Sequence, residues 1–378
     1  MTKKCKDWLT LHRPSTPCLV IDLEEITNTF KLFKRTFPYT VPFYAVKANP
    51  ASQILKCLDG LGSFFDAASI NEINTCLKCY IDPAKISYGN TIKKEKDISL
   101  AYKLGIRVFV FDCIEELHKI SRAAPKASVF CRVLVSNDGA MWPLNKKFGC
   151  TLEAAKELII EAKNLGLQPI GLSFHVGSQQ TLASTWSDAL KTVAPLYNIF
   201  SEQGSVMDTI NLGGGIPISY VEPALDIMEI SKNVFNSVEK IFKNKKPKKM
   251  FMEPGRFLVG SSGIIETEII LITEKNDGKK FKWLYLDIGK FGGLAETEGE
   301  AIRYPIETVN NNYDDQVESF IISGPTCDSQ DILYQQHQYA LPKNLKIGDR
   351  LRIGSTGAYT SVYASNFNGI EKLDEYYI

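Results

Sequence analysis

The residue of this chain best suited to covalent chemistry with a carbonyl group is Lys47. It follows the run 41–46, Val-Pro-Phe-Tyr-Ala-Val, whose apolar and aromatic residues predict a short buried strand that Pro50 then ends. Because its neighbours belong to a core, we expect the Lys47 amine to be poorly solvated and therefore nucleophilic toward aldehydes. The competing interpretation is a lysine whose head reaches solvent from the strand end.

A second set of polar or glycine residues stands at, or just after, other strand-like runs. Each member has an ordinary explanation: a helix cap, a satisfied interior histidine or a tight glycine turn. Their joint occurrence at successive strand ends indicates an active site instead. The set comprises Asp66, Arg132, His175, Gly213, Gly214, Gly215, Glu253 and Arg256.

The chemistry that unites these residues with Lys47 is that of an aldehyde cofactor with a phosphate group. Gly213–Gly215 leave backbone N–H groups uncovered by side chains, which suits a phosphate, and Arg256 adds a charged donor. A lysine that binds the aldehyde as a Schiff base points to pyridoxal 5′-phosphate. We expect Glu253 to keep the pyridine nitrogen protonated and His175 to stack on the ring.

The elements that must position these residues alternate between strands and helices. Strict alternation predicts parallel strands, and eight strands predict a TIM-like (β/α)8 barrel with its chemistry at the C-terminal strand ends. A doubly wound sheet is the alternative. The eight strand-like runs are Phe43–Val46, Ser63–Asp66, Ile86–Tyr88, Val108–Phe111, Val129–Val133, Ile170–Phe174, Thr209–Leu212 and Met250–Met252.

The pattern changes after Gly255, where strand-like runs are separated by Gly and Pro turns with few helical stretches between them. We expect a mostly-β domain that also takes the N-terminal strand Thr16–Ile21. The predicted domains are the cofactor-binding barrel at 24–256 and the β domain at 1–23 and 257–378. The runs are Ile264–Thr273, Lys280–Asp287, Val317–Ile322, Arg350–Ile353 and Tyr376–Ile378.

Composition narrows the function class. The 378 residues carry a net charge of +1, which argues against nucleic acid or an anionic membrane as the main partner. No apolar run approaches the roughly 20 residues that span a bilayer, and the N-terminus lacks the apolar core of a signal peptide. Nine irregularly spaced cysteines fit free thiols in a reducing cytoplasm. The Cys76–Cys79 pair has no second pair or histidine partner, so we expect no metal site.

Six segments together resemble those of the PLP-dependent basic amino acid decarboxylases with the alanine-racemase-like fold, ornithine decarboxylases above all. The resemblance covers the chain from about residue 16 to the C-terminus. It implies a barrel plus a β domain, and a homodimer whose active sites are shared between subunits. It also implies conversion of L-ornithine to putrescine and carbon dioxide, a step of polyamine biosynthesis. The segments are Pro42–Lys47, Phe174–Ser178, Gly213–Gly215, Glu253–Arg256, Gly324–Asp328 and Gly357–Thr360.

The resemblance also implies a role for each matching residue. Cys327 of the partner subunit would reprotonate the substrate carbon after carbon dioxide is lost, and Asp328 beside it would bind the distal ammonium. The competing interpretation of Cys327 is a buried small hydrophobic residue. Lys147 and Asp331 match positions that form a salt bridge across the dimer. In the cofactor site, Lys47 would hold PLP, His175 would stack on its ring and Glu253 would pair with its nitrogen; Ser178, Gly215, Arg256 and Tyr359 would bind phosphate, and Asp66 and Arg132 would lie near the phenolic oxygen.

Substrate choice rests on a segment that departs from the eukaryotic ornithine decarboxylases. They carry a second aspartate after the stretch that here reads Gly289–Gly293, whereas this chain offers Glu296, Glu298 and Glu300. One of the three is expected to contact the substrate, and an exposed acidic loop is the alternative. Lysine is one methylene longer than ornithine, a difference worth only about 1–3 kcal/mol, so a lysine or dual lysine/ornithine decarboxylase stays open. Asp328, where diaminopimelate decarboxylases have Glu, argues against diaminopimelate.

Two other classes remain. An amino acid racemase would share the fold, but its Lys-Asn-Ala-Tyr-Gly pattern is absent around Lys47. A non-catalytic decarboxylase-like binder of regulatory partners would not need Lys47, Glu253, Arg256 and Cys327 together. Small PLP carriers of the superfamily lack a β domain, which the roughly 120 C-terminal residues of this chain provide.

Overall fold

The structure is a computed structural model that describes residues 1–202, 207–276, 280–309 and 316–378. The chain divides into two compact units. The barrel unit comprises residues 27–217 and 225–258, and the β unit comprises residues 1–26, 218–224 and 259–378. The predicted domain boundaries at residues 24 and 256 stay a prediction.

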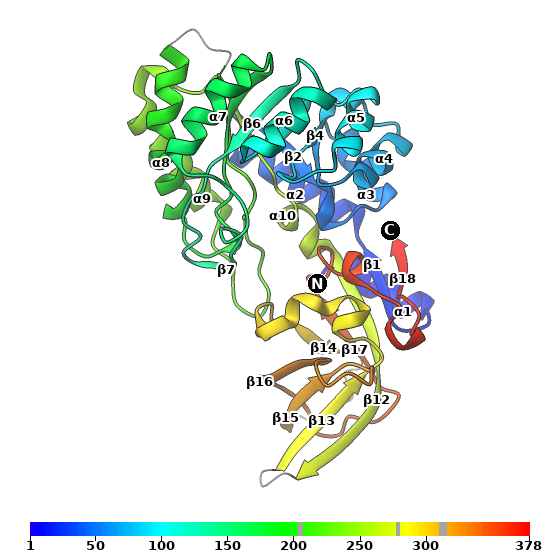
Figure 1. Cartoon of the computed structure of the whole chain (residues 1–378). Coiled ribbons are helices and arrows are strands. Elements are labelled where there is room, and N and C mark those ends of the chain that lie inside the picture. Colours follow the sequence, from blue (N-terminus) through cyan, green and yellow to red (C-terminus); the bar gives the residue numbers. More distant parts are fainter. Residues whose placement is uncertain (203–206, 277–279, 310–315) are drawn as a thin grey trace. The chain divides into compact units, whose positions relative to one another are not determined.

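In the described part of the barrel unit, eight parallel strands close into a barrel in their order along the chain (Figure 1). The predicted (β/α)8 barrel is therefore confirmed, and the alternative of an open doubly wound sheet is wrong. Its strands are β2 (Thr40–Ala45), β3 (Phe64–Ala67), β4 (Ile86–Tyr88), β5 (Val108–Phe111), β6 (Ser128–Arg132), β8 (Gln168–Ser173), β10 (Thr209–Asn211) and β11 (Lys249–Met252).

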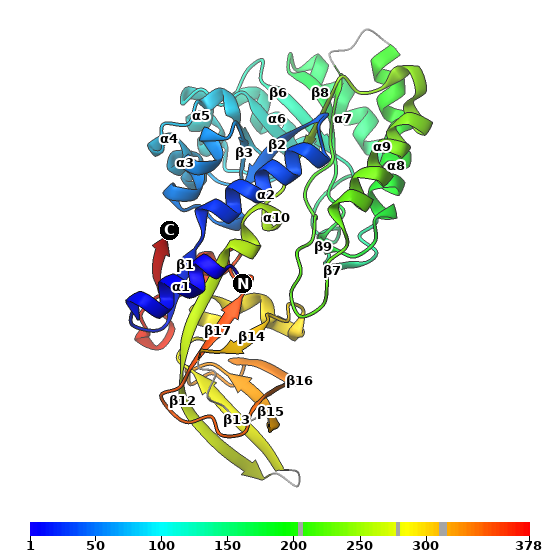
Figure 2. The same cartoon turned by 180° about the vertical axis from the view of Figure 1, so that it is seen from behind.

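Helices connect the strands and cover the outside of the barrel, as the two opposite views of Figures 1 and 2 show. They form where the apolar period is helical and where the sequence supplies a cap. Ser69 Oγ accepts from the Glu72 N–H while Glu72 accepts from the Ala68 N–H, a capping box that starts α4. The helices are α2 (Leu23–Thr36), α3 (Ser52–Gly60), α4 (Ile70–Lys78), α5 (Glu95–Lys103), α6 (Ile114–Ala123), α7 (Leu152–Asn164), α8 (Ser184–Glu202), α9 (Ile227–Phe242) and α10 (Arg256–Val259).

Phenylalanine rings pack together along the barrel strands. Phe251 lies 4.6 Å from Phe43 and 5.7 Å from Phe130, measured between ring centroids. Burying one such side chain contributes roughly 2 kcal/mol, and the tilted and edge-on ring contacts add to that. The packed strands give the side chains at the C-terminal strand ends, called the rim below, a rigid base.

The β unit is built on one sheet in which, among the described residues, the path β14-β17-β12-β13-β15-β16 is extended by β1 and β18. As predicted, the N-terminal strand joins this sheet, because β1 pairs antiparallel with β12 and parallel with β18. The strands are β1 (Cys18–Ile21), β12 (Gly263–Asn276), β13 (Lys280–Leu286), β14 (Ile306–Thr308), β15 (Val317–Ser323), β16 (Ile332–Pro342), β17 (Arg350–Gly354) and β18 (Asp374–Tyr377).

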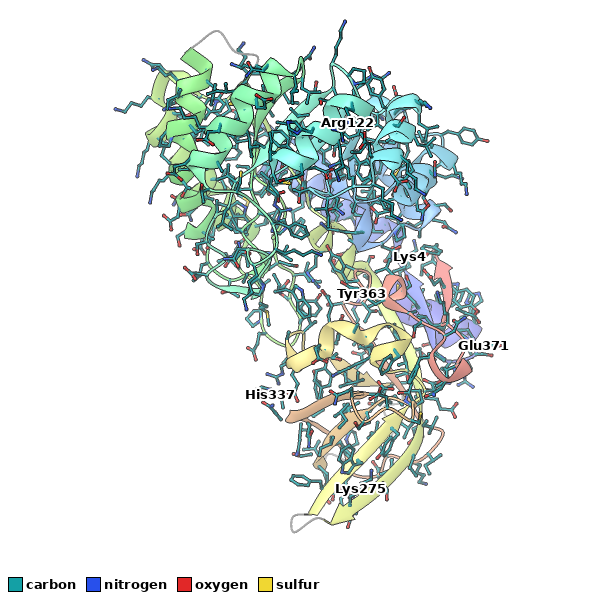
Figure 3. The ribbon with its side chains drawn as sticks, in the orientation of Figure 1. Lys4, Arg122, Lys275, His337, Tyr363 and Glu371 are labelled. Carbon is teal, nitrogen blue, oxygen red and sulfur yellow. The ribbon has the colours of Figure 1, made fainter. Side chains whose placement is uncertain are left out.

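Several elements of the structure have no counterpart in the sequence prediction. Helix α1 (Lys3–His12) places Cys5 and Leu9 in a buried cluster with Cys18, Val20 and Ile264 of the sheet. The short antiparallel pair β7 (Ala140–Trp142) and β9 (Ser178–Gln180) follows rim strands of the barrel unit. Strand β16 was missed too, and Figure 3 labels His337 on it. None of the described helices has both the length and the apolar character needed to cross a membrane.

Candidate active site

Lys47 lies in a single 3-10 turn, Val46–Ala48, that directly follows β2. The turn is fixed by the residue after it. The Asn49 N–H donates to the Val46 carbonyl (3.1 Å), and the Tyr44 hydroxyl donates to the Asn49 carbonyl (2.8 Å). A Cβ atom on Gly255 would lie 3.0–3.1 Å from the Cβ atoms of Ala45 and Ala48, so the segment after β11 packs tightly against this turn.

The expectation that Lys47 is poorly solvated is wrong for the chain by itself. Val46 and Ala48 are buried, but the Lys47 side chain between them is exposed. The strand ends at Ala45, and the tighter turn that follows directs alternate side chains away from the core. The Lys47 amine would therefore lose its contact with water only when a cofactor ring is bound over it. The position of Lys47 on the rim agrees with the prediction, and its covalent role stays a proposal.

Asp66 on β3 is a buried carboxylate that faces the same rim. Its Oδ1 accepts a hydrogen bond from the Ser87 hydroxyl of β4 (2.8 Å), and a Cβ on Gly89 would lie only 1.9 Å from that oxygen. Burial raises the pKa of Asp66 well above its ordinary value, and the negative charge of Glu253 raises it further, whereas Lys47 lowers it. Asp66, Glu253 and Lys47 are therefore close enough to influence one another electrically.

Glu253, the residue after β11, is held by an amide that the sequence prediction missed. Asn211, at the end of β10, donates from Nδ2 to Glu253 Oε1 at 2.6 Å. The Asn211 Oδ1 accepts from the Gly213 N–H (3.0 Å), and the Glu253 N–H donates to the Gly213 carbonyl (2.8 Å). Asn211 is buried, and its amide can donate only with its nitrogen, so it orients one carboxylate oxygen of Glu253. The only sequence signal was a polar residue closing an apolar strand.

His175 follows β8 and is held as a neutral imidazole. Its Nδ1 accepts from the Gly177 N–H (3.0 Å), which leaves the ring proton on Nε2. Burial lowers the pKa of His175 well below its ordinary value, and the positive charges of Arg132 and Lys47 lower it further. An uncharged ring fits the predicted stacking role, because it covers an aromatic face without adding a charge.

Arg132 ends β6 on the same side of the barrel. Its guanidinium lies 5.0 Å from the centroid of the Phe148 ring. Burial lowers the pKa of Arg132, while the negative charges of Glu253, Asp112 and Asp66 raise it. These contributions link Arg132 to the carboxylates of three other strand ends, and Asp112 is a member of this group that the sequence prediction did not name.

Ser178 and Arg256 form a second cluster on the rim. The buried Arg256, the first residue of α10, donates from Nη2 to Ser178 Oγ at 3.2 Å and from Nε at 3.4 Å. Ser178 begins β9, where its partner across the strand pair is Trp142. The structure thus brings together two residues that are 78 positions apart and that the resemblance assigned to one phosphate.

The glycines after β10 allow the rim segments to approach one another closely. A Cβ on Gly213 would lie 2.2 Å from the Phe174 carbonyl oxygen, and one on Gly215 would lie 2.5 Å from the Gly177 carbonyl oxygen. Gly213 also has a φ of +66° and Gly215 a φ of +108°, which other residues rarely adopt. The Gly213 N–H is used by Asn211, which corrects the expectation that all three N–H groups face a ligand.

The residues present fit pyridoxal phosphate. Among the described residues, the N–H groups of Gly214 and Gly215 have no hydrogen-bond acceptor, and Gly215 packs against Gly177, next to Ser178. Two backbone donors beside a hydroxyl and a buried guanidinium are a donor set for a phosphate. An amine, a carboxylate and a neutral imidazole at neighbouring strand ends match the other parts of the cofactor.

Cys327, Asp328 and Tyr359 are predicted site residues of the β unit. Cys327 lies on the loop after β15, and its thiol is exposed, so the interpretation as a buried small hydrophobic residue is wrong. Asp328 is half-buried, and its Oδ1 accepts from the Gln330 N–H (2.8 Å). Tyr359 has a φ of +55°, in the left-handed region. Their roles toward cofactor and substrate stay predictions.

Asp331 accepts hydrogen bonds within its own unit, and the expected salt bridge with Lys147 across a dimer stays a prediction. Its side chain is 2% exposed. Oδ1 accepts from the Lys290 N–H (2.8 Å), and Oδ2 accepts from the N–H (3.1 Å) and the hydroxyl (2.7 Å) of Thr326. The carboxylate therefore joins the loop after β13 to the loop that carries Cys327.

The three candidate glutamates of the substrate pocket differ in their surroundings. Glu300 accepts from the backbone N–H groups of residues 335–337 and from His337 Nδ1 (2.7 Å), so both of its oxygens anchor β16. These hydrogen bonds lower the pKa of Glu300 despite partial burial. Glu298 is exposed and pairs with Lys290 (2.7 Å), whereas Glu296 is buried. Both oxygens of Glu300 are thus used within its own unit, and the substrate role of the three glutamates stays a prediction.

Sequence comparison identifies the family that this fold and this rim define. A family model described as the pyridoxal binding domain of pyridoxal-dependent decarboxylases matches residues 23–260. The chain is 32% identical over 358 residues to the lysine/ornithine decarboxylase of Selenomonas ruminantium, which covers 94% of this chain and 88% of the relative. It is 30% identical over 368 residues to antizyme inhibitor 2 of Xenopus laevis, with 95% and 80% covered.

Two solved structures agree with this result. SrLDC in complex with PLP and cadaverine has a TM-score of 0.87 at 30% identity, covering 99% of this chain and 93% of that one. The arginine decarboxylase of Paramecium bursaria Chlorella virus, bound to agmatine, has a TM-score of 0.90 at 26% identity and covers all of both chains. The chain belongs to the pyridoxal-dependent decarboxylases. Its cofactor is pyridoxal phosphate, and within the family it falls among the decarboxylases of basic amino acids.

Proposed function

We propose that this chain decarboxylates L-ornithine to putrescine and carbon dioxide, a step of polyamine biosynthesis. The proposal rests on the arrangement of three groups on the rim. These are the Lys47 amine, the Glu253 carboxylate oriented by Asn211, and the anion-binding pair of Ser178 and Arg256. These groups suit the aldehyde, the ring nitrogen and the phosphate of one bound cofactor.

Bound pyridoxal phosphate supplies an electron sink that accepts the electron pair left on the substrate carbon as carbon dioxide departs. The residues of the chain hold it in place. Lys47 would bind the aldehyde, Glu253 would hold a proton at the ring nitrogen, and the neutral His175 would stack on the ring. Asp66 and Arg132 would lie near the phenolic oxygen, and the family resemblance implies that Tyr359 would bind the phosphate.

Substrate recognition needs a carboxylate for the distal ammonium, because an unpaired charge in a closed pocket is costly. We assign this role to Asp328 together with Glu296 or Glu298. Cys327 gives its thiol proton to the carbon that has lost carbon dioxide and regains a proton from water. As the family resemblance implies, Cys327 and Asp328 act from the partner subunit of a homodimer.

The test is carbon dioxide release by the PLP-loaded protein from ornithine, lysine, arginine and diaminopimelate, measured side by side. We expect kcat/KM for ornithine to exceed that for lysine by about 10-fold or more, the discrimination available from one methylene. Similar values for ornithine and lysine would replace the proposal by a dual-specificity enzyme. The similarity to the Selenomonas lysine/ornithine decarboxylase favours this second candidate.

The similarity to antizyme inhibitor 2 keeps a non-catalytic regulatory binder as a further candidate. The same assay separates the two: a protein that binds PLP but releases carbon dioxide from none of the four substrates would support the binder. A racemase would be recognised by loss of optical rotation of the amino acid without release of carbon dioxide.

A further inference from the structure

We propose that Asn368 is a positioning residue for Cys327, whose side-chain amide fixes the Sγ atom and donates a hydrogen bond to the thiolate that proton transfer leaves behind. The inference rests on the proposed function in one respect, the role of Cys327 as proton donor. It adds a residue that the family resemblance did not name.

The contact between the two residues uses both ends of the amide. Asn368 Oδ1 accepts from the Cys327 backbone N–H at 3.0 Å, and Asn368 Nδ2 donates to Cys327 Sγ at 3.2 Å. A side-chain amide has a fixed plane, so two hydrogen bonds from it define both the loop position and the direction of the thiol. A hydrogen bond donated by an N–H group to a sulfur atom stabilises negative charge on that sulfur.

The segment around Asn368 is built to hold this geometry. Asn368 has a φ of +56°, in the left-handed region that asparagine tolerates better than most residues. The Phe367 ring beside it packs on Phe291 with 4.7 Å between ring centroids, and the Ser365 N–H donates to the Phe291 carbonyl (2.9 Å). The segment is thereby tied to the loop after β13 as well as to Cys327.

The consequence concerns where the proton goes. When carbon dioxide leaves, an electron pair remains that can take a proton at the substrate carbon, which leads to the amine. If the proton is instead taken at the cofactor carbon, hydrolysis by water would release an aldehyde and leave the amino group on the cofactor. Cys327 directs the first outcome by giving up its Sγ proton. The Asn368 donor stabilises the resulting thiolate, which takes a proton back from water before the next turnover. Loss of that donor shifts product toward the aldehyde.

The decisive variant is Asn368→Asp, which keeps the size of the side chain and an oxygen for the Cys327 N–H but replaces the donor at Sγ by an acceptor. We expect the aldehyde-to-amine ratio to rise about 10-fold, the scale of one hydrogen bond to a charged group. The cofactor absorption spectrum before substrate is added should stay unchanged. Asn366→Asp is the matched control, since it places the same charge on an exposed side chain two residues away. A ratio in Asn368→Asp equal to that of this control would overturn the proposal.

A second measurement does not depend on activity. Cys327 in the intact PLP-loaded protein is alkylated with iodoacetamide at pH 7.5, and its modified peptide is quantified by mass spectrometry. The thiolate is the reactive form, so Asn368→Asp should slow the reaction several-fold relative to Asn366→Asp. Equal rates refute the link between Asn368 and Cys327. Slowed alkylation in a protein without decarboxylase activity would instead support the link and reject the proposed function.

Discussion

At the scale of single residues, the rim contains a carboxylate that lowers the free energy of unfolding when it is charged. Asp66 is buried, and burial together with the charge of Glu253 raises its pKa well above the ordinary value. A group whose folded-state pKa is raised costs no stability below its unfolded pKa, near 4. It destabilises the fold as the pH rises from there through the folded value. A buried charge that lowers the stability of the fold is typical of a functional site.

The first prediction follows from this cost. Asp66→Asn should raise the Tm of the cofactor-free protein at pH 7.5 by about 2–4 °C, and the gain should disappear near pH 4. Its amide oxygen still accepts from Ser87, so the packing against Gly89 is preserved. Thermal unfolding at both pH values measures the effect, and Asp59→Asn, at a partly exposed ion pair with Lys85, serves as the control. A Tm below that of the unchanged protein at pH 7.5 would show that Asp66 stabilises the fold.

Single residues also show where sequence reasoning stopped. The positions of Lys47, His175, Glu253 and Arg256 could be predicted because each follows a clear strand. The exposure of Lys47 could not, because the strand ends at Ala45, one residue before the predicted end, and a 3-10 turn follows. Asn211 was missed because an amide side chain is neither acidic nor nucleophilic. Its role depends on a hydrogen bond to Glu253, which is 42 residues away in the sequence.

At the scale of elements, the loop that carries Cys327 is fixed by Asp331. A Cβ on Gly289 or on Gly324 would lie within 2.4 Å of the Asp331 carboxylate, so both loops pack directly against it. Three donors from Lys290 and Thr326 depend on the same two oxygens. Removing a buried acceptor leaves its donors unsatisfied, a cost larger than the net contribution of the hydrogen bonds themselves.

We therefore expect Asp331→Ala to lower the free energy of unfolding by about 2–4 kcal/mol, measured by urea denaturation of the intact chain. Ser329→Ala, at an exposed position of the same loop, should change it by less than about 0.5 kcal/mol. If the two variants were equally stable, Asp331 would not join the loops in solution.

The elements of the barrel were more predictable than those of the β unit. Barrel strands are buried apolar runs framed by helices, so β4 and β5 were predicted with their observed bounds. Strand β16 was missed because its middle, Gln335–Gln338, is polar and carries no alternation of apolar residues. Its stability comes from pairing with β15 and from the distant carboxylate of Glu300, neither of which is a local signal.

At the scale of the whole molecule, the chain combines a barrel unit that holds the cofactor residues with a β unit that carries Cys327 and Asp328. Fold and family could be predicted from the sequence because eight strand ends and six short segments agree with one another. Substrate preference could not, since spacing alone does not distinguish the three candidate glutamates, and a difference of one methylene is worth only about 1–3 kcal/mol.

The central claim is that Lys47 holds pyridoxal phosphate and that this complex decarboxylates a basic amino acid. It is tested most directly by carbon dioxide release from carboxyl-labelled L-ornithine by the PLP-loaded protein and by Lys47→Ala, with the absorption band of lysine-bound cofactor recorded in the same samples. The account predicts that Lys47→Ala loses the band and at least about 10³-fold of the activity, because a covalent step is removed. A Lys47→Ala protein that retains both the band and the activity would contradict it.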